Sequence, residues 1–268
     1  MLISHALLVP HLPTLMIDEH RGHVSGMVAA LREASERLRA ETPAAVVVLT
    51  SRWESPGPFL VDAGARHRTI TDYAGFGVEV RYDCPGHPAL ARALVHAGAK
   101  AGLRAAAATR GADSGVAVPM YFLAPARDLA VVPISIASRP AAECRAWGAA
   151  LRGALAAWRE RLAFVVSGLL SNNMHAWLLR REVPEAGEFD RSTLEALEQG
   201  AWPRLGAHDE RTLERAQPEA QLRHLEVLRG FLGEDARGEV RCYEASPGVG
   251  SALVEFAIPG APADVAPA

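Results

Sequence analysis

The sequence predicts one α/β domain over residues 1–260, with a central mostly parallel or mixed sheet, helices on both faces and a C-terminal β-hairpin. Three observations lead to this class. The valine-rich run Ala44–Leu49 shows no polar alternation, which is typical of a strand buried on both faces. Strand-like and helix-like segments alternate along the chain, as they do in α/β proteins. No charge block, repeat or Ser/Gly linker divides the 268 residues.

Short apolar runs and one amphipathic pattern define the elements near the start of the chain. Leu2–Val9 is a mostly apolar strand, and the two prolines of Pro10–Pro13 stiffen the turn that follows it. Apolar residues at helical spacing predict a helix over His23–Arg39. Beyond the valine-rich strand, Phe59–Asp62 and Val78–Tyr82 are short runs that predict two further strands.

The middle of the chain continues the alternation. Pro88 lies near the start of a predicted helix that extends to about Ala101, where proline is well tolerated. Gly111–Gly115 predicts a loop, with an apolar continuation beyond it. Leu129–Ile136 and Ala163–Leu170 are apolar runs that predict strands, and the alanine-rich segment between them, Pro140–Arg161, predicts a helix.

The last part of the chain predicts three helices and a hairpin. Glu188–Gln199 and Asp209–Ala216 are predicted helices around an acidic connection, and Glu219–Leu232 carries leucines on one helical stripe. Gly238–Ala245 and Ser251–Ile258 predict the paired strands of the hairpin. Residues 261–268 are rich in Pro and Ala and predict a disordered tail.

Composition excludes several classes of function. The net charge of −3 and the pI of about 6.4 favour neither nucleic acid nor an anionic membrane as a partner. Cys84, Cys144 and Cys242 have no metal-ligand spacing and predict free thiols in a reducing compartment. We find no signal-peptide pattern and no apolar run long enough to span a membrane, so we expect a soluble, cytoplasmic protein.

The end of the valine-rich strand predicts the place of the functional site. In open α/β sheets, ligands bind beyond the carboxyl ends of the strands. Ser51, Arg52 and Trp53 are therefore expected at the rim of the site.

Five segments together indicate a family. They are Asp72–Phe76, Tyr82–Ala91, Gly111–Leu123, Ser167–Ser171 and Gly248–Phe256. Their order and spacing resemble the class III extradiol ring-cleavage dioxygenases, the LigB-like superfamily that includes the β subunit of protocatechuate dioxygenase. The resemblance implies a single α/β domain and, in active members, Fe(II) held by two histidines and one carboxylate.

The resemblance implies an incomplete metal site in this chain. His11 matches the first ligand, and Glu219 is the nearest match to the acidic ligand. The second histidine position holds Arg52, whose guanidinium stays protonated and cannot coordinate a metal. We expect Arg52 to reach into the vacated iron position and to pair with Glu219 or a nearby carboxylate. For His11, a simple turn-capping role is the alternative.

Other family positions also depart from the pattern. Ser114 and Asn172 stand where family members usually carry histidines that move protons, and both residue types also suit ordinary loops. His175 is a possible substitute for them or a packed helix residue. Four residues are predicted to contact a substrate: Arg52, Trp53, Tyr73 and His87. Aromatic packing is the alternative for the two aromatic residues, and a place at a helix start is the alternative for His87.

Three functions remain open from the sequence. The first, which we favour, is a non-catalytic subunit that supports a homologous catalytic dioxygenase subunit, similar to the α subunit of aminophenol dioxygenases. Such a chain needs no cofactor of its own and works in a hetero- or homo-oligomer. The second is a complete dioxygenase with Fe(II) in a rebuilt site of His11, His175 and Glu219, acting on a catechol or aminophenol. The third is a binding protein for a small aromatic acid held by Arg52.

Overall fold

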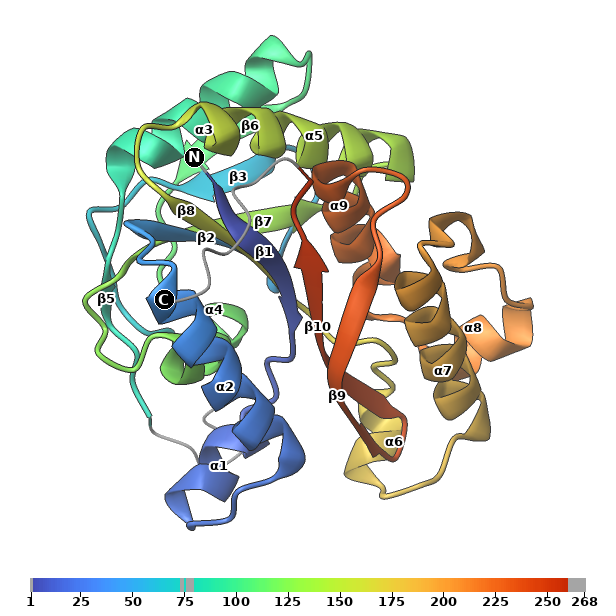
Figure 1. The fold of residues 1–268 in the computed structure, drawn as a ribbon. Helices are drawn as coiled ribbons and strands as arrows, with labels where there is room; N and C mark the ends of the chain where they lie inside the picture. Colours follow the sequence, from blue (N-terminus) through green and yellow to red (C-terminus); the bar gives the residue numbers. More distant parts are fainter. Residues whose placement is uncertain (1, 73–74, 76–79, 260–268) are drawn as a thin grey trace, which may run out of the picture.

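The computed structural model describes residues 2–72, 75 and 80–259, and a large sheet runs through them (Figure 1). Its eight strands have the order β6-β3-β7-β2-β8-β1-β10-β9. The strands are β1 (Leu2–Val9), β2 (Ala45–Ser55), β3 (Phe59–Asp62), β6 (Ala105–Ala108), β7 (Ala130–Ala137), β8 (Leu162–Ser167), β9 (Gly238–Ser246) and β10 (Val249–Ala257). A separate two-stranded ladder pairs β4 (Arg66–His67) with β5 (Cys84–Pro85).

The centre of the sheet is parallel and both sides become antiparallel. Strands β7, β2, β8 and β1 run in the same direction, and Leu49 of β2 lies opposite Ile134 and Val166. On one side β3 is antiparallel to β7, and on the other side β10 is antiparallel to β1. The predicted mixed α/β sheet with a C-terminal hairpin, β9–β10, is confirmed.

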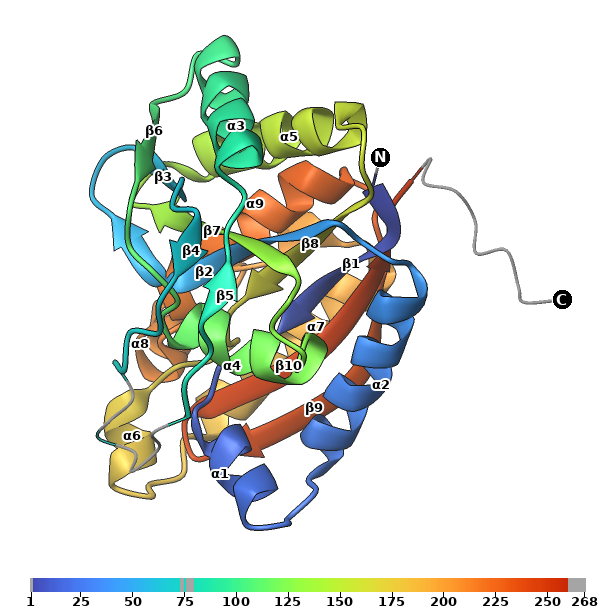
Figure 2. The same cartoon turned by 90° about the vertical axis from the view of Figure 1, so that its left-hand side faces the viewer.

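Two hydrophobic cores lie on the two faces of this sheet. In β2, Val47 and Leu49 belong to one core, whereas Val46 and Val48 belong to the other. The first core is covered by α3 (Pro88–Lys100), α5 (Ala141–Ala157), α7 (Pro184–Gln199) and α9 (Arg223–Leu232). The second is covered by α1 (Thr14–His20), α2 (Gly26–Ala40) and α4 (Ser114–Leu123), as Figure 2 shows. The strand shows no alternation in its sequence because both of its faces are buried.

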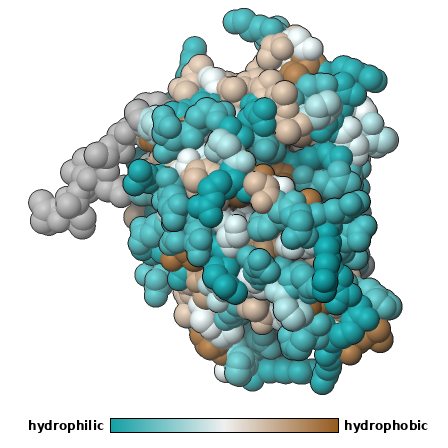
Figure 3. Space-filling model, turned by 90° about the vertical axis from the view of Figure 1, so that its right-hand side faces the viewer, coloured by the Kyte–Doolittle hydropathy of each residue, from teal (hydrophilic) through white to brown (hydrophobic). Residues whose placement is uncertain are grey.

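Shorter helices lie near the other end of the chain. They are α6 (Met174–Leu178), α8 (Glu210–Ala216) and the two 3₁₀ turns η2 (Trp202–Arg204) and η3 (Glu219–Leu222). None of the helices in residues 2–72, 75 and 80–259 is long and apolar enough to cross a membrane. The face in Figure 3 is mostly hydrophilic, and its hydrophobic residues are scattered between polar ones.

The structure differs from the sequence predictions at several elements. Helix α4 and strand β6 were not predicted, because α4 is buried on nearly all sides and β6 consists of four alanines. The strand predicted at Val78–Tyr82 lies partly outside the described residues, and residues 80–83 form no strand. The helix predicted from Glu219 begins instead at Arg223. The predicted tail, residues 261–268, lies outside the described residues.

Candidate functional site

A buried ion pair lies at the carboxyl ends of β1 and β8. His11 is in the turn after β1, and its Nε2 lies 3.3 Å from Oε1 of Glu219, with both side chains 5% exposed. The peptide N–H of Glu219 donates to the carbonyl of Leu170 at 3.0 Å, and the Glu219 carboxylate accepts the N–H of Leu169. The end of β8 therefore holds both the main chain and the side chain of Glu219 beside His11.

The segment that carries Glu219 has an unusual backbone. Ala220, Gln221 and Leu222 have φ angles of 50°, 51° and 63°, all in the left-handed region. For residues other than glycine this conformation costs about 1–2 kcal/mol each. Contacts around the segment must offset this cost, and backbone strain of this kind is concentrated at functional sites. The turn directs the Glu219 carboxylate toward His11 and starts α9 in a new direction.

A second imidazole, that of His224, lies close enough to this pair to interact with its charges. His224 is in the first turn of α9, is fully buried and packs against Gly168. A Cβ added to Gly168 would lie 2.6 Å from Cδ2 of His224, so the ring fits only because this residue is glycine. We did not predict His224 as a site residue, because one histidine in an amphipathic helix carries no local signal.

The charge states of these groups depend on one another. Burial opposes ionisation of Glu219, but His11, His224 and the Leu169 N–H outweigh it and lower the pKa of Glu219 to about 2. Burial lowers the pKa of His224 to about 4, although Glu219 acts in the opposite direction. At pH 7 Glu219 is therefore ionised and His224 is neutral.

Unpartnered polar atoms gather at this edge of the sheet. Within the described part of the chain, ten buried side-chain nitrogen or oxygen atoms make no hydrogen bond. Six of these ten belong to His11, Ser51, Ser167, Asn172 and His224, the last with both ring nitrogens. The Leu169 backbone lies near the His224 ring but outside hydrogen-bonding geometry. Buried polar atoms normally have partners, so this cluster marks a place built around polar groups that the chain itself does not supply.

Arg52 lies beside this edge and pairs with a carboxylate other than Glu219. Its Nε is 3.9 Å from Oδ2 of Asp72, and its side chain is 43% exposed. The Asp72 carboxylate also accepts hydrogen bonds from the N–H and Oγ of Ser114, each at 2.9 Å. We predicted that Arg52 pairs with Glu219 or with a nearby carboxylate. The structure shows the second of these, and the carboxylate is that of Asp72. Arg52 does not fill the buried position beside His11, because its side chain is half-exposed.

The remaining predicted substrate contacts are dispersed. Trp53 is buried, and the Arg110 guanidinium lies 5.4 Å from the centre of its ring. His87 is the N-cap of α3 and accepts the N–H of Leu90 at 3.2 Å, which supports the helix-start alternative for this residue. Tyr73 lies outside the described residues.

Asn172 and His175 have different surroundings. The N–H of Asn172 donates to the carbonyl of Ala216 at 3.0 Å, and its buried Oδ1 is one of the unpartnered atoms. His175 is an exposed residue of α6. The imidazole that the fold brings near His11 and Glu219 is that of His224, so His175 does not substitute for the missing family histidine.

Gly168 gives the first testable prediction. We expect Gly168→Ala to lower the free energy of unfolding by about 1–3 kcal/mol, because the new methyl group overlaps the His224 ring. The matched control is Gly153→Ala in α5, where an added Cβ meets nothing within 4 Å. That variant gains about 0.5–1 kcal/mol from helix propensity. Urea unfolding measures both. Equal effects of the two substitutions contradict the tight contact.

Asp190 supports the strand end next to Asn172 and gives the second prediction. Its buried carboxylate accepts the N–H and Oγ of Ser171 at 2.8 and 2.9 Å and the hydroxyl of Tyr243 at 2.9 Å. Burial raises the pKa of Asp190. We expect Asp190→Ala to cost about 2–4 kcal/mol, because it leaves buried donors unpaired. Tyr243→Phe removes a single donor and should cost about 1 kcal/mol in the same denaturation experiment. The interpretation fails if the two variants are equally stable.

The residues present do not fit the Fe(II) centre that the family resemblance implies. That centre needs two histidines and a carboxylate. Within residues 2–72, 75 and 80–259, no group of three or more His, Cys, Asp or Glu side chains is arranged to hold a metal ion. His11 and Glu219 contact each other, and the nearby imidazole of His224 is not arranged with them to hold a metal ion. Arg52, which the family resemblance matches to the second histidine, is a cation.

Residues 5–254 match the family described as the catalytic LigB subunit of aromatic ring-opening dioxygenase. The chain therefore belongs to the LigB family of ring-cleaving dioxygenases, whose extradiol members generally use Fe(II).

Two curated relatives and one solved structure place the chain further. It is 32% identical to dioxygenase tasH of Hapsidospora irregularis over 52% of this chain and 44% of that protein. It is 30% identical to 4,5-DOPA dioxygenase extradiol of Beta vulgaris over 38% of this chain and 40% of that protein. The matched part thus spans less than half the length of these relatives. The uncharacterized protein JW3007 of Escherichia coli K12 shares the fold, with a TM-score of 0.72 and 20% identity over 94% of this chain and 99% of that one.

Proposed function

We propose that this chain is a non-catalytic subunit of an aromatic ring-opening dioxygenase, which supports a homologous subunit with a complete iron site. One observation carries the proposal. His11 and Glu219 contact each other at 3.3 Å without a third residue, among those described, arranged to complete a metal site, and the resemblance matches Arg52 to the other histidine ligand. An arginine offers no lone pair to a metal at any accessible pH.

The surface offers support for a partner subunit. Among the described residues, the large hydrophobic side chains that are exposed are Val24, Leu178 and Leu179. Leu178 and Leu179 are consecutive, at the end of α6, and are 69% and 61% exposed. Adjacent exposed leucines are unfavourable in water unless another surface covers them.

Iron reconstitution tests the missing centre. The purified chain is incubated anaerobically with ferrous ammonium sulfate, desalted and analysed for iron. Oxygen uptake is then measured with catechol, protocatechuate and 2-aminophenol. We expect far less than one iron per chain and no oxygen uptake, whereas a LigB homologue that retains all ligands serves as the positive control. One tightly bound iron per chain, lost in His11→Ala and accompanied by ring opening, supports a complete dioxygenase and contradicts the proposal.

Co-expression tests the supporting role. The chain is expressed together with a LigB-family homologue that keeps histidines at the positions matching 11, 52, 114 and 172. We expect the two to copurify and the homologue to gain thermal stability or turnover. The double variant Leu178→Glu/Leu179→Glu should weaken the complex, and Val24→Glu serves as the matched surface control. A homologue that is equally stable and active alone argues against a supporting subunit.

A further inference from the structure

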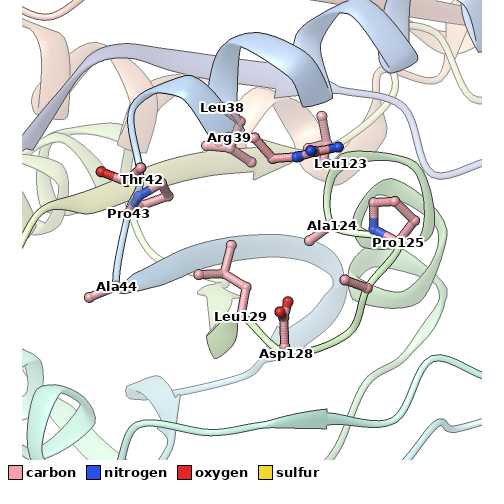
Figure 4. Close-up of a pocket in the computed structure, with 11 residues that line it drawn as sticks. Leu38, Arg39, Thr42, Pro43, Ala44, Leu123, Ala124, Pro125, Asp128 and Leu129 are labelled. Carbon is pink, nitrogen blue, oxygen red and sulfur yellow. The ribbon is translucent and has the colours of Figure 1, made fainter.

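A cavity of about 600 Å³ lies at the opposite edge of the sheet from the His11–Glu219 pair. It is formed where α2 leads into β2 and where α4 leads into β7, so it lies at the amino ends of these two parallel strands (Figure 4). Its volume is within the range of small-molecule sites, about 300–1,000 Å³. It shares no lining residue with the site described above.

The wall of this cavity is largely apolar. Leu38 and Leu123 are buried, and Leu129 is half-buried. The prolines Pro43 and Pro125 stiffen the two connections that form its rim. Such a wall offers an apolar surface to a compact apolar group.

Two opposite charges line the same cavity. Figure 4 shows Arg39 on one side and Asp128 on the other, and both residues are also exposed to solvent at the open side of the cavity. Within the described part of the chain, neither side chain is within the 4.0 Å ion-pair distance of an opposite charge. Two arginines near this region, Arg37 and Arg161, are by contrast paired with carboxylates.

We propose that this cavity binds a small zwitterion with an apolar body, such as an amino acid with a hydrophobic side chain. Arg39 takes the carboxylate of the ligand, Asp128 takes its ammonium group, and the leucine and proline wall takes its side chain. A ligand with a single charge pairs with one of these two residues and leaves the other without a partner. It is also repelled by the residue that carries the same charge as the ligand. This proposal is independent of the proposed function, because it involves none of the residues of the His11–Glu219 site.

Three probes with the same apolar body test the ligand class. They are L-phenylalanine, which is a zwitterion, 3-phenylpropionate, which is an anion, and 2-phenylethylamine, which is a cation. Backbone ¹⁵N–¹H spectra of the full chain are recorded during each titration. We expect L-phenylalanine to bind most tightly, with shifts concentrated in residues 38–44 and 123–129. No binding by any probe, equal binding by all three, or shifts located elsewhere overturns the proposal.

Charge variants provide the second arm of the test. Arg39→Gln and Asp128→Asn should each weaken binding of L-phenylalanine about tenfold, because each removes one charge-assisted hydrogen bond. Asp128→Asn should also strengthen binding of 3-phenylpropionate, because it removes the repulsion. Arg21→Gln and Asp235→Asn change exposed charges outside the cavity and should leave both affinities unchanged. Binding of L-phenylalanine that is insensitive to Arg39→Gln and Asp128→Asn contradicts the assignment.

Discussion

Glu219→Leu is expected to lower the free energy of unfolding by about 3–5 kcal/mol, the usual cost of removing one partner from a buried ion pair. The substitution removes the carboxylate that lies 3.3 Å from the buried His11 ring and takes the acceptor away from the Leu169 N–H. Urea or guanidinium denaturation at pH 7 measures the change. Glu33→Gln is the control, since Glu33 is 70% exposed and 4.0 Å from Arg37. An exposed pair of this kind contributes about 0–1 kcal/mol.

The double variant His11→Leu/Glu219→Leu tests whether His11 and Glu219 stabilise the fold through their contact with each other or independently. Replacing both partners of a buried pair by apolar residues is often neutral or stabilising. We therefore expect the double variant to be more stable than Glu219→Leu alone, with a strongly non-additive cycle. If the two single losses simply add, the His11–Glu219 contact contributes nothing as a pair.

Acidification from pH 6.5 to pH 4 is expected to remove about 3 kcal/mol of stability through His224, at roughly 1.4 kcal/mol for each pH unit between its unfolded and folded pKa. Burial lowers the pKa of His224 to about 4 in the folded state, whereas the ordinary pKa of histidine in an unfolded chain is 6.5. Between these values the unfolded state binds the additional proton, so stability falls as the pH falls. Below pH 4 this contribution levels off.

His224→Leu isolates this contribution from those of the other histidines. As the pH falls from 6.5 to 4, we expect His224→Leu to lose less stability than the unmodified chain, so the variant becomes the more stable of the two. At pH 7 the variant should be at least as stable, because both ring nitrogens of His224 lack a hydrogen bond. Glu219 acts in a lower window: its pKa is depressed from 4.5 to about 2, so its contribution is lost as the pH falls through about 2. Parallel pH profiles for the two proteins contradict the buried, neutral state of His224.

Much of the fold could be predicted because burial leaves a clear pattern in strands. Val46, Val47 and Val48 point to alternate cores, so a strand buried twice appears as an unbroken apolar run. Helix α4 could not be predicted for the same reason. A helix that is buried on nearly all sides does not show the alternation of apolar and polar residues with a period of 3.6. The left-handed turn before α9 is formed by Ala220, Gln221 and Leu222, none of which favours this conformation, so no local rule predicts it.

The candidate site was less predictable, because its contacts join distant parts of the chain. The family resemblance indicated His11 and Glu219 as matches to metal ligands, and the structure places them in contact. The family resemblance could not indicate that Arg52 pairs with Asp72, because that contact depends on where the loop with Asp72 passes the start of α4. His224 reaches the site only because Gly168 has no side chain, and neither residue is informative alone.

The place of β1 between β8 and β10 has a consequence for synthesis on the ribosome. Leu8 pairs with Val166 on one side and with Val254 on the other, and the Ile258 N–H donates to the Ser4 carbonyl at 2.7 Å. Strand β1 thus acquires one of its two neighbours only when residues 249–257 have left the exit tunnel. Nascent chains halted before that point should expose the edge of β1 and bind chaperones, so the turn that carries His11 becomes fixed only after β10 has emerged.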